Sequence, residues 1–331
     1  MMVISAQNGA VRNRFGDKRA FEIMKDAGFT GVDFAIHGMN DFEEVVMDAN
    51  APSHAEKIRR LAEDTGLSVI ASHAPHKFKA GMAMDETEME FCRIVRSIEF
   101  AGWLGAPLIV VHALRLLPEE RPEDLREEQD KTLALNLTWY RTLEPFAKKA
   151  GIKIAVENLP ARGPDKAYCP RLLGDARSFM EILDLLDPER FTGCFDVGHA
   201  NLTMKDPASF IREAGQYIHH LHLHDNDGHR DLHLMPAFGK LEGSGSKNTF
   251  SVSWNEVARA LSDVGYDGPF NYECSTWYGS FARDLIPEAM ALSAKAAKPM
   301  ARLIESGRQP DLVRPVSEVN CNNRMKKKYK Q

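Results

Sequence analysis

Eight short apolar segments alternate with amphipathic segments along almost the whole chain, and this repeat constrains the fold more than any other feature. The apolar segments are predicted to be strands at residues 3–5, 31–37, 67–73, 107–112, 152–158, 192–199, 218–225 and 269–275. Helices are predicted at residues 18–27, 54–65, 85–104, 131–150, 175–186, 206–214, 254–264 and 287–306. Several of them end at a glycine, such as Gly28, Gly66 or Gly151, as helix C-termini commonly do.

Repeated strand–helix units predict parallel strands, and their right-handed crossovers curl such strands into a closed barrel. A doubly wound open sheet is the alternative, and it would usually carry a Gly-rich phosphate-binding turn. No GxGxxG motif or P-loop follows the first strand. We therefore predict an α/β protein, a single (β/α)8 TIM barrel over residues 1–308, with a long loop after strand seven (228–253) and a polar tail at 309–331.

The bulk composition narrows the class of protein. The chain has 331 residues, of which 44% are hydrophobic and 27% charged, as in ordinary globular proteins. A net charge of −5 disfavours a nucleic-acid partner. Five scattered cysteines without a CxxC pair indicate reduced thiols. The N-terminus lacks a signal-peptide pattern, and no apolar run approaches the ~20 residues of a membrane span. We expect a cytoplasmic protein with no membrane partner.

Metal-capable side chains end six successive predicted strands. They are His73, His112, Glu157, Asp196, His222 and Glu273. Because the C-terminal ends of parallel barrel strands open onto one face, these groups are expected to converge there. A carboxylate in a barrel mouth is costly to desolvate unless it is paired or bound to a metal. A mixed oxygen and nitrogen set suits Mn²⁺, Mg²⁺, Co²⁺ or Zn²⁺ rather than a thiolate-bound metal.

The segment HHLHLHDNDGHRDLHLMP is the richest in such groups. Alternate strand residues share a face, so His220, His222 and His224 are predicted to point one way. His222 falls late enough in the strand to be a ligand, whereas His220 lies deeper and is predicted to be a structural core residue. Asp231 and His233 on the following loop form either an extra metal or substrate site or a hydrogen-bonded loop anchor.

The segments ENLP, FDVGHAN, HLHDNDGHRDLHLMP and YEC together resemble the xylose-isomerase-like barrel superfamily. It contains sugar and sugar-phosphate isomerases and epimerases as well as AP endonucleases of the endonuclease IV type. The resemblance spans residues 1–305. It implies one divalent metal, with Mn²⁺ preferred over Co²⁺, Mg²⁺ or Zn²⁺, held by Glu157, Asp196, His222 and Glu273.

The resemblance also implies isomerisation or epimerisation of a sugar or sugar phosphate through an enediolate. The metal would polarise the substrate oxygens, and Glu157 and Glu273 would exchange the proton α to the carbonyl. The candidate substrate-binding residues are His199, Arg230, His73 and His112. No phosphate clamp is evident after strands seven and eight, where Arg230 and Lys240 are the nearby cations. A homo-oligomer or a partner subunit is compatible with the sequence.

Two alternative activities stay open. The endonuclease branch binds three zinc ions, and its nine ligand types occur at His73, His112, Glu157, Asp196, His199, His222, Asp231, His233 and Glu273. However, strand four ends VHAL rather than His-Pro-Gly, strand six reads FDVGH rather than Asp-Thr-Cys-His, and strand seven reads HLHDND rather than HLNDSK. Lyases of the superfamily use the same α-proton abstraction to expel a leaving group, and nothing in the sequence excludes that chemistry.

Overall fold

Eight parallel strands form a nearly closed barrel in the computed structural model, which describes residues 1–77, 84–117, 120–121, 124–162, 167–203, 205–236 and 252–307. In order around the barrel they are β1 (Ile4–Gln7), β2 (Gly31–Phe34), β3 (Ser68–His73), β4 (Leu108–Val111), β5 (Lys153–Glu157), β8 (Phe191–Asp196), β9 (Ile218–His222) and β10 (Phe270–Tyr272). Two hydrogen bonds bridge the seam between β9 and β10, from Leu223 N to Asn271 O (3.0 Å) and from Glu273 N to Leu223 O (3.2 Å). The predicted barrel is confirmed.

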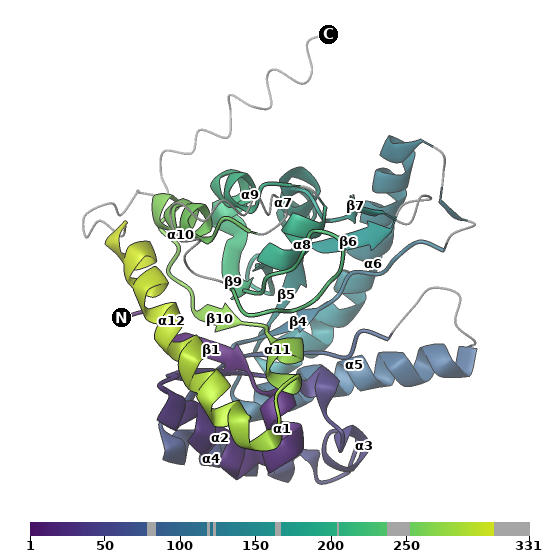
Figure 1. Ribbon diagram of the computed structural model, residues 1–331. Helices are drawn as coiled ribbons and strands as arrows, with labels where there is room; N and C mark the ends of the chain where they lie inside the picture. The colour runs from purple at the N-terminus through teal and green to yellow at the C-terminus, as the bar shows by residue number, and fades with distance from the viewer. Residues whose placement is uncertain are drawn as a thin grey trace.

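Helices surround the strands (Figure 1). Those that correspond to the eight predicted helices are α2 (Asp17–Ala27), α4 (Ala51–Thr65), α5 (Met84–Leu104), α6 (Leu125–Ala150), α7 (Ala176–Asp184), α9 (Pro207–Ala214), α10 (Trp254–Asp263) and α12 (Ile286–Ser306). The shorter α1 (Gly9–Phe15), α3 (Phe42–Val45), α8 (Val197–Leu202) and α11 (Ser275–Gly279) lie in the connections. Gly28, Gly66 and Gly151 end their helices in the left-handed conformation, with φ of 101°, 72° and 71°.

Helix α6 begins six residues before the predicted start, inside the acidic stretch that precedes it. The side chain of Asp124 caps the helix by accepting a hydrogen bond from Glu127 N at 2.9 Å. Acidic side chains in a first helical turn interact favourably with the helix dipole, which explains why so polar a segment is helical.

An antiparallel hairpin of β6 (Leu159–Arg162) and β7 (Tyr168–Leu172) follows β5 directly and was not predicted from the sequence. Its strands are short and contain Pro160 and Pro170, so they lack the alternating apolar pattern that marks a strand. The hairpin extends the mouth of the barrel between β5 and α7.

The interior of the barrel has an apolar part and a polar part. One buried cluster is separate from the main hydrophobic core and consists of Ala71, Leu108, Val110, Ala155 and Cys194. The strands on the other side of the barrel contribute fully buried polar residues, namely Ser5, Asp33, His220 and Asn271. Because strand side chains alternate between faces, the residues two positions beyond these inward-facing groups reach the C-terminal mouth.

Some predicted features fall outside the described residues. These are the centre of the strand-seven loop at 237–251, which includes Lys240, and the chain from residue 308 onward, so the predicted boundary between barrel and tail stays a prediction. Within the described ranges, no helix combines the length and the apolar character needed to cross a membrane.

Candidate metal centre

Three carboxylates converge on one histidine nitrogen at the C-terminal mouth of the barrel. Nδ1 of His222 lies 2.8 Å from Glu157 Oε1, 3.2 Å from Glu273 Oε2 and 3.9 Å from Asp196 Oδ2. One potential ligand atom from each of the four residues lies within 4.8 Å of the others, and all four residues are buried. The structure therefore brings together the four side chains that the sequence proposes as the metal set.

Asp196 is held in place by its neighbours in the sequence and by the adjacent strand. Asn158 Nδ2 donates to Asp196 O (2.9 Å), and Asp196 N donates to Asn158 Oδ1 (2.6 Å), so the ends of β5 and β8 are tied together. Asp196 Oδ1 accepts a hydrogen bond from His199 N at 2.6 Å and thereby caps α8. This cap ends the strand at Asp196 and leaves Oδ2 facing the centre.

Two further side chains orient members of the set. Gln7 Nε2, at the end of β1, donates to Glu273 Oε1 at 2.7 Å. Asp33 Oδ2, at 3.7 Å, is the carboxylate oxygen facing Nε2 of His222, and it also accepts a hydrogen bond from Asn271 Nδ2 at 2.9 Å. Metal-binding histidines commonly point their second ring nitrogen at such a carboxylate, which fixes the ring orientation.

The electrostatic environment keeps the centre charged. Burial on its own would raise the pKa of Glu157, but the charges of His222 and His112 outweigh it and hold the pKa well below its ordinary value. Burial would lower the pKa of His222, yet the surrounding Cys194 and Glu273 groups raise it well above its ordinary value. Glu157 therefore remains ionised at neutral pH, and its buried negative charge requires a cation beside it, either a protonated histidine or a metal.

The donor set fits a divalent metal. Such ions bind oxygen and nitrogen ligands at about 2.0–2.2 Å, so the ligand atoms of one site lie within roughly 4.4 Å of each other. His222 Nδ1 lies 2.8, 3.2 and 3.9 Å from oxygens of Glu157, Glu273 and Asp196, which is within that limit. In addition, Glu157 Oε2 is buried and makes no well-aligned hydrogen bond among the described residues, although His112 Nε2 lies 2.9 Å from it. Glu157, Asp196, His222 and Glu273 are the residues that would hold the ion.

A second group of metal-capable side chains adjoins this centre. One atom from each of His199, His224, Asp231 and His233 lies within 4.8 Å of the others. The Asp231 carboxylate is 3.5 Å from His199 Nε2 and 3.3 Å from His233 Nε2. The ring of His224 stacks on His233 with centroids 4.0 Å apart, and its Nε2 lies 3.0 Å from Asp196 Oδ2. The second group therefore touches the first through His224.

The second group also has the properties of a loop anchor. Burial would lower the pKa of His199, but Asp196 and Asp231 raise it to about 10. The hydrogen bond and charge of Asp231 likewise outweigh burial at His233 and raise its pKa to about 9. Ion pairs to Asp231 thus hold the loop after β9 against α8, and both predicted roles of Asp231 and His233 stay open.

A third group lies on the other side of Glu157. His73, His76 and His112 each offer one atom within 4.8 Å of the others. His112 Nε2 is 2.9 Å and His73 Nε2 3.8 Å from Glu157 Oε2. Burial lowers the pKa of His76 to about 3, with a further contribution from His112 and His73. A neutral imidazole at this place suits a metal ion or a substrate hydroxyl.

A cavity of about 540 Å³ opens beside the three groups. His76, His112, His199 and Asp231 line one side of it. The segment after β4 and the β6–β7 hairpin line the other side. Its volume lies within the range of small-molecule sites, roughly 300–1,000 Å³. His112 and His199, which lie 2.9 and 3.6 Å from the Glu157 carboxylate, therefore face a space that is large enough for a sugar.

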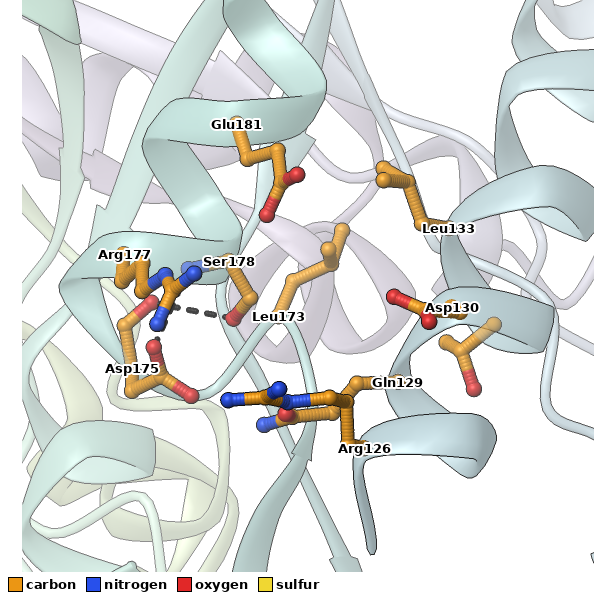
Figure 2. A pocket seen from close by; sticks show the side chains of 10 residues that line it. Arg126, Gln129, Asp130, Leu133, Leu173, Asp175, Arg177, Ser178 and Glu181 are labelled. Atoms are coloured by element: carbon orange, nitrogen blue, oxygen red, sulfur yellow. Dashed lines mark hydrogen bonds between the residues drawn. The ribbon is translucent and has the colours of Figure 1, made fainter. Parts of the chain in front are cut away.

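A second cavity of about 290 Å³ lies between the start of α6 and the start of α7 (Figure 2). Figure 2 shows Arg126, Gln129 and Asp130 of α6 facing Asp175 and Glu181 across it. None of the residues in the three metal-capable groups lines this cavity. We place the candidate active site in the larger cavity for that reason.

A family model described as the xylose isomerase-like TIM barrel matches residues 21–296. The chain belongs to this family. An uncharacterized protein of Methanocaldococcus jannaschii is 29% identical over 228 residues, which cover 67% of this chain and 70% of that protein. A D-psicose 3-epimerase of Enterocloster bolteae is 24% identical over 262 residues, which cover 74% of this chain and 78% of that protein.

Solved structures of the xylose isomerase-like family superpose on the barrel. The crystal structure of a D-tagatose 3-epimerase-like protein aligns with a TM-score of 0.64 at 21% sequence identity, covering 92% of this chain and 99% of that one. At this level of identity the likeness supports the fold, and the predicted resemblance to the xylose isomerase-like family is confirmed.

The predicted substrate-binding residues fall into two classes in this family member. His73, His112 and His199 all lie at the centre, within 4 Å of the Glu157 carboxylate. Arg230 lies apart, with 71% of its side chain exposed and its guanidinium paired with Asp227 at 2.7 Å. Its role in substrate binding stays a prediction that none of its contacts supports.

Several residues of the site were not singled out by the sequence. His224 was recognised only as sharing the face of His222, although its place two residues later on the same strand carried the signal. His76 follows the third strand by three residues, in the same way that His199 follows Asp196, and that spacing would have found it. Gln7 ends the first strand, and Asp33 lies one residue before the end of the second.

Proposed function

We propose that the protein is a divalent-metal-dependent epimerase or isomerase of a sugar or sugar phosphate. The observation that carries the proposal is the approach of two carboxylates, Glu157 and Glu273, to the same nitrogen of His222 at 2.8 and 3.2 Å. The family and its relatives support the proposal, since a D-psicose 3-epimerase is among the proteins similar to this chain.

Epimerisation of a ketose needs proton removal on one face of a carbon next to the carbonyl and proton return on the other. Glu157 ends β5 and Glu273 follows β10, and two strands, β8 and β9, separate them around the barrel. The two carboxylates therefore reach the substrate from different directions, so one can take the proton and the other can return it. A cation held by the four residues would polarise the carbonyl and stabilise the enediolate charge.

Neighbouring side chains orient the two carboxylates for proton transfer. Gln7 occupies Glu273 Oε1 with a hydrogen bond of 2.7 Å, which leaves Oε2 directed at the centre. His112 Nε2 lies 2.9 Å from Glu157 Oε2. His112 also lines the cavity, where its imidazole can hydrogen-bond a substrate oxygen. His199 lines the same cavity on the far side of Glu157.

Proton exchange in deuterium oxide tests the proposal. With a ketose substrate, the wild-type protein is expected to introduce deuterium at the carbon next to the carbonyl. Glu157→Gln and Glu273→Gln should each slow this exchange roughly 10²- to 10⁴-fold, the usual contribution of a general acid or base. Glu181→Gln, which alters the second cavity, is the matched control. Exchange at near-normal rates in both site variants would exclude the carboxylate pair.

A second candidate function is phosphodiester hydrolysis at three zinc ions, and the three adjoining metal-capable groups favour it. Glu157 and Asp196 both belong to the first group. Glu157 also contacts His112 of the third group, and Asp196 also contacts His224 of the second group. Metal analysis separates the candidates, because one equivalent of Mn²⁺ or Co²⁺ agrees with the epimerase and three of zinc with the hydrolase. Enzyme-like cleavage of an oligonucleotide with an abasic site would replace the first proposal by the second.

A further inference from the structure

The large cavity has a basic end, which two arginines define. Arg115, on the segment after β4, and Arg162, at the end of β6, both line it. His112, His199 and Asp231 line the end next to the metal-capable groups. Two arginines and members of the metal-capable groups thus line a single space.

Arg115 has no carboxylate partner in the described part of the chain. Within that part, its Nη2 donates a hydrogen bond to Pro160 O at 3.3 Å. Burial lowers the pKa of the guanidinium, and the positive charges of Arg121 and Arg162 lower it further. A cation that is partly desolvated and surrounded by like charge is costly unless an anion joins it.

The second cation is held in position by the hairpin. The Arg162 guanidinium lies over the Tyr168 ring at 4.2 Å from its centroid, and Nη2 donates to Tyr168 Oη at 3.1 Å. Arg121 links the two sides of this basic end, since it donates to Leu116 O (3.4 Å) and to Arg162 O (3.1 Å). The β6–β7 hairpin, which the sequence did not predict, therefore places the guanidinium of Arg162 in the same cavity as Arg115.

The cavity also has an apolar wall. It is formed by Leu114, Leu116, Trp139 and Leu159. Such a wall packs against the carbon face of a sugar and carries no charge of its own. A ligand that spans the cavity is thereby held by its ends.

We propose that this cavity takes a ketose that bears an oxyanion, a phosphate or a carboxylate, at the end far from its carbonyl, with the oxyanion bound by Arg115 and Arg162. The inference rests on the proposed function only in placing the carbonyl of the ketose at the metal centre. The carboxylates of Glu157, Asp196 and Glu273 would repel an anion, so an anionic substrate enters with its charged end toward the arginines. Arginine forks match the geometry of phosphate and carboxylate oxygens.

The test compares three ketoses that differ at one end: fructose, fructose 6-phosphate and the ketose uronic acid fructuronate. Initial rates give kcat/KM for each, and calorimetry with the metal-loaded protein gives binding without turnover. The variants are Arg115→Gln and Arg162→Gln, with Arg115→Lys keeping the charge but losing the fork. Arg19→Gln is the matched control, because Arg19 is exposed on α2 and pairs with Glu22.

Wild type is expected to bind at least one anionic ketose ~10-fold or more tightly than fructose. Each Gln variant should remove most of that preference while fructose binding stays within twofold, and Arg115→Lys should fall between wild type and Arg115→Gln. The comparison of fructose 6-phosphate with fructuronate shows whether the bound oxyanion is a phosphate or a carboxylate. Equal binding of all three ketoses, or a preference that survives both Gln variants, overturns the inference.

The design separates this inference from the proposed function. Turnover of fructose without any anionic preference supports the epimerase and overturns the basic subsite. Arginine-dependent binding of an anionic ketose without turnover or deuterium exchange supports the subsite and overturns the epimerase. Binding of none of the ketoses overturns both. Thermal unfolding of every variant shows whether an effect comes from lost structure.

Discussion

Nδ1 of His222 lies 2.8 Å from Oε1 of Glu157, and two further carboxylates face the same nitrogen. His219, on the same strand, is exposed and points to the opposite side. The pair of histidines therefore separates the effect of the centre from the effect of changing a residue in β9.

We expect Mn²⁺ to stabilise the folded protein, and this stabilisation to depend on His222. A ligand at 100-fold excess over its Kd adds about 2.7 kcal/mol to the free energy of unfolding, or roughly 5 °C in Tm for a chain of this size. His222→Gln should abolish the shift, whereas His219→Gln should retain it. Differential scanning fluorimetry with and without a chelator measures both. An equal shift in both variants would place the metal elsewhere.

Asp33 provides a second prediction, since its Oδ2 lies 3.7 Å from Nε2 of both His220 and His222. Asp33→Asn keeps the shape but removes the charge that orients the His222 ring. Changes to such supporting groups lower metal affinity roughly 10- to 100-fold. Competition with a fluorescent chelator gives the affinity. A variant that binds metal as tightly as wild type would show that the ring needs no carboxylate behind it.

The strand ends carried most of the information that the sequence offered about the site. Glu157, Asp196, His222 and Glu273 were found because each follows an apolar strand, and a barrel brings all such positions to one mouth. The barrel itself followed from eight repeats, because periodicity and helix-ending glycines are local properties of the chain. These features depend on neighbours in the sequence, which is why they could be predicted.

Contacts between distant loops could not be predicted in this way. Arg115 and Arg162 are separated by 46 intervening residues and meet at one cavity only because the β6–β7 hairpin, which follows β5, places Arg162 there. The approach of His224 to Asp196 depends on a register shift between β8 and β9, next to Gly193 and Cys194. Neither the hairpin nor the shift leaves a periodic pattern, so the basic end of the cavity and the place of His224 in the second group emerged from the structure alone.

An ion pair away from the site gives a prediction about stability and pH. Arg12 is buried, and its guanidinium contacts Asp17 and Asp41 at 2.6 Å each. The hydrogen bond from Arg12 holds the pKa of Asp41 below its ordinary value. A carboxyl group with a lowered folded pKa stabilises the protein above its unfolded pKa of about 3.9, and this contribution is lost as the pH falls through the folded value.

Asp41→Asn is therefore expected to lower the free energy of unfolding by ~1 kcal/mol at pH 7, a value discounted because the carboxylate is partly exposed. The difference from wild type should shrink as the pH drops below about 4. Urea unfolding at pH 7, 5 and 3 measures it, with the exposed Asp26→Asn as control. A difference that is the same at every pH would assign the effect to packing instead of charge.

Gly198 lies in α8 against the ring of His224, so a Cβ at this position would overlap the imidazole. Gly279 is its matched control, because it also lies in a helix and a Cβ there meets nothing within 4 Å. Alanine favours a helix over glycine by about 1 kcal/mol, so any destabilisation at Gly198 must come from the overlap. The two substitutions are expected to differ in sign.

Gly198→Ala should push His224 away from Asp196 Oδ2, lower the free energy of unfolding by roughly 1–3 kcal/mol and reduce turnover. Gly279→Ala should leave both within error or slightly raise stability. Adding His224→Ala to Gly198→Ala removes the overlapping ring, so the two changes together should cost less than the sum of their separate effects. Urea unfolding of the four proteins in this cycle measures the coupling. If the two changes in the free energy of unfolding were strictly additive, the ring of His224 would yield to the new methyl group without cost. The contact of His224 with Asp196 would then not position the carboxylate.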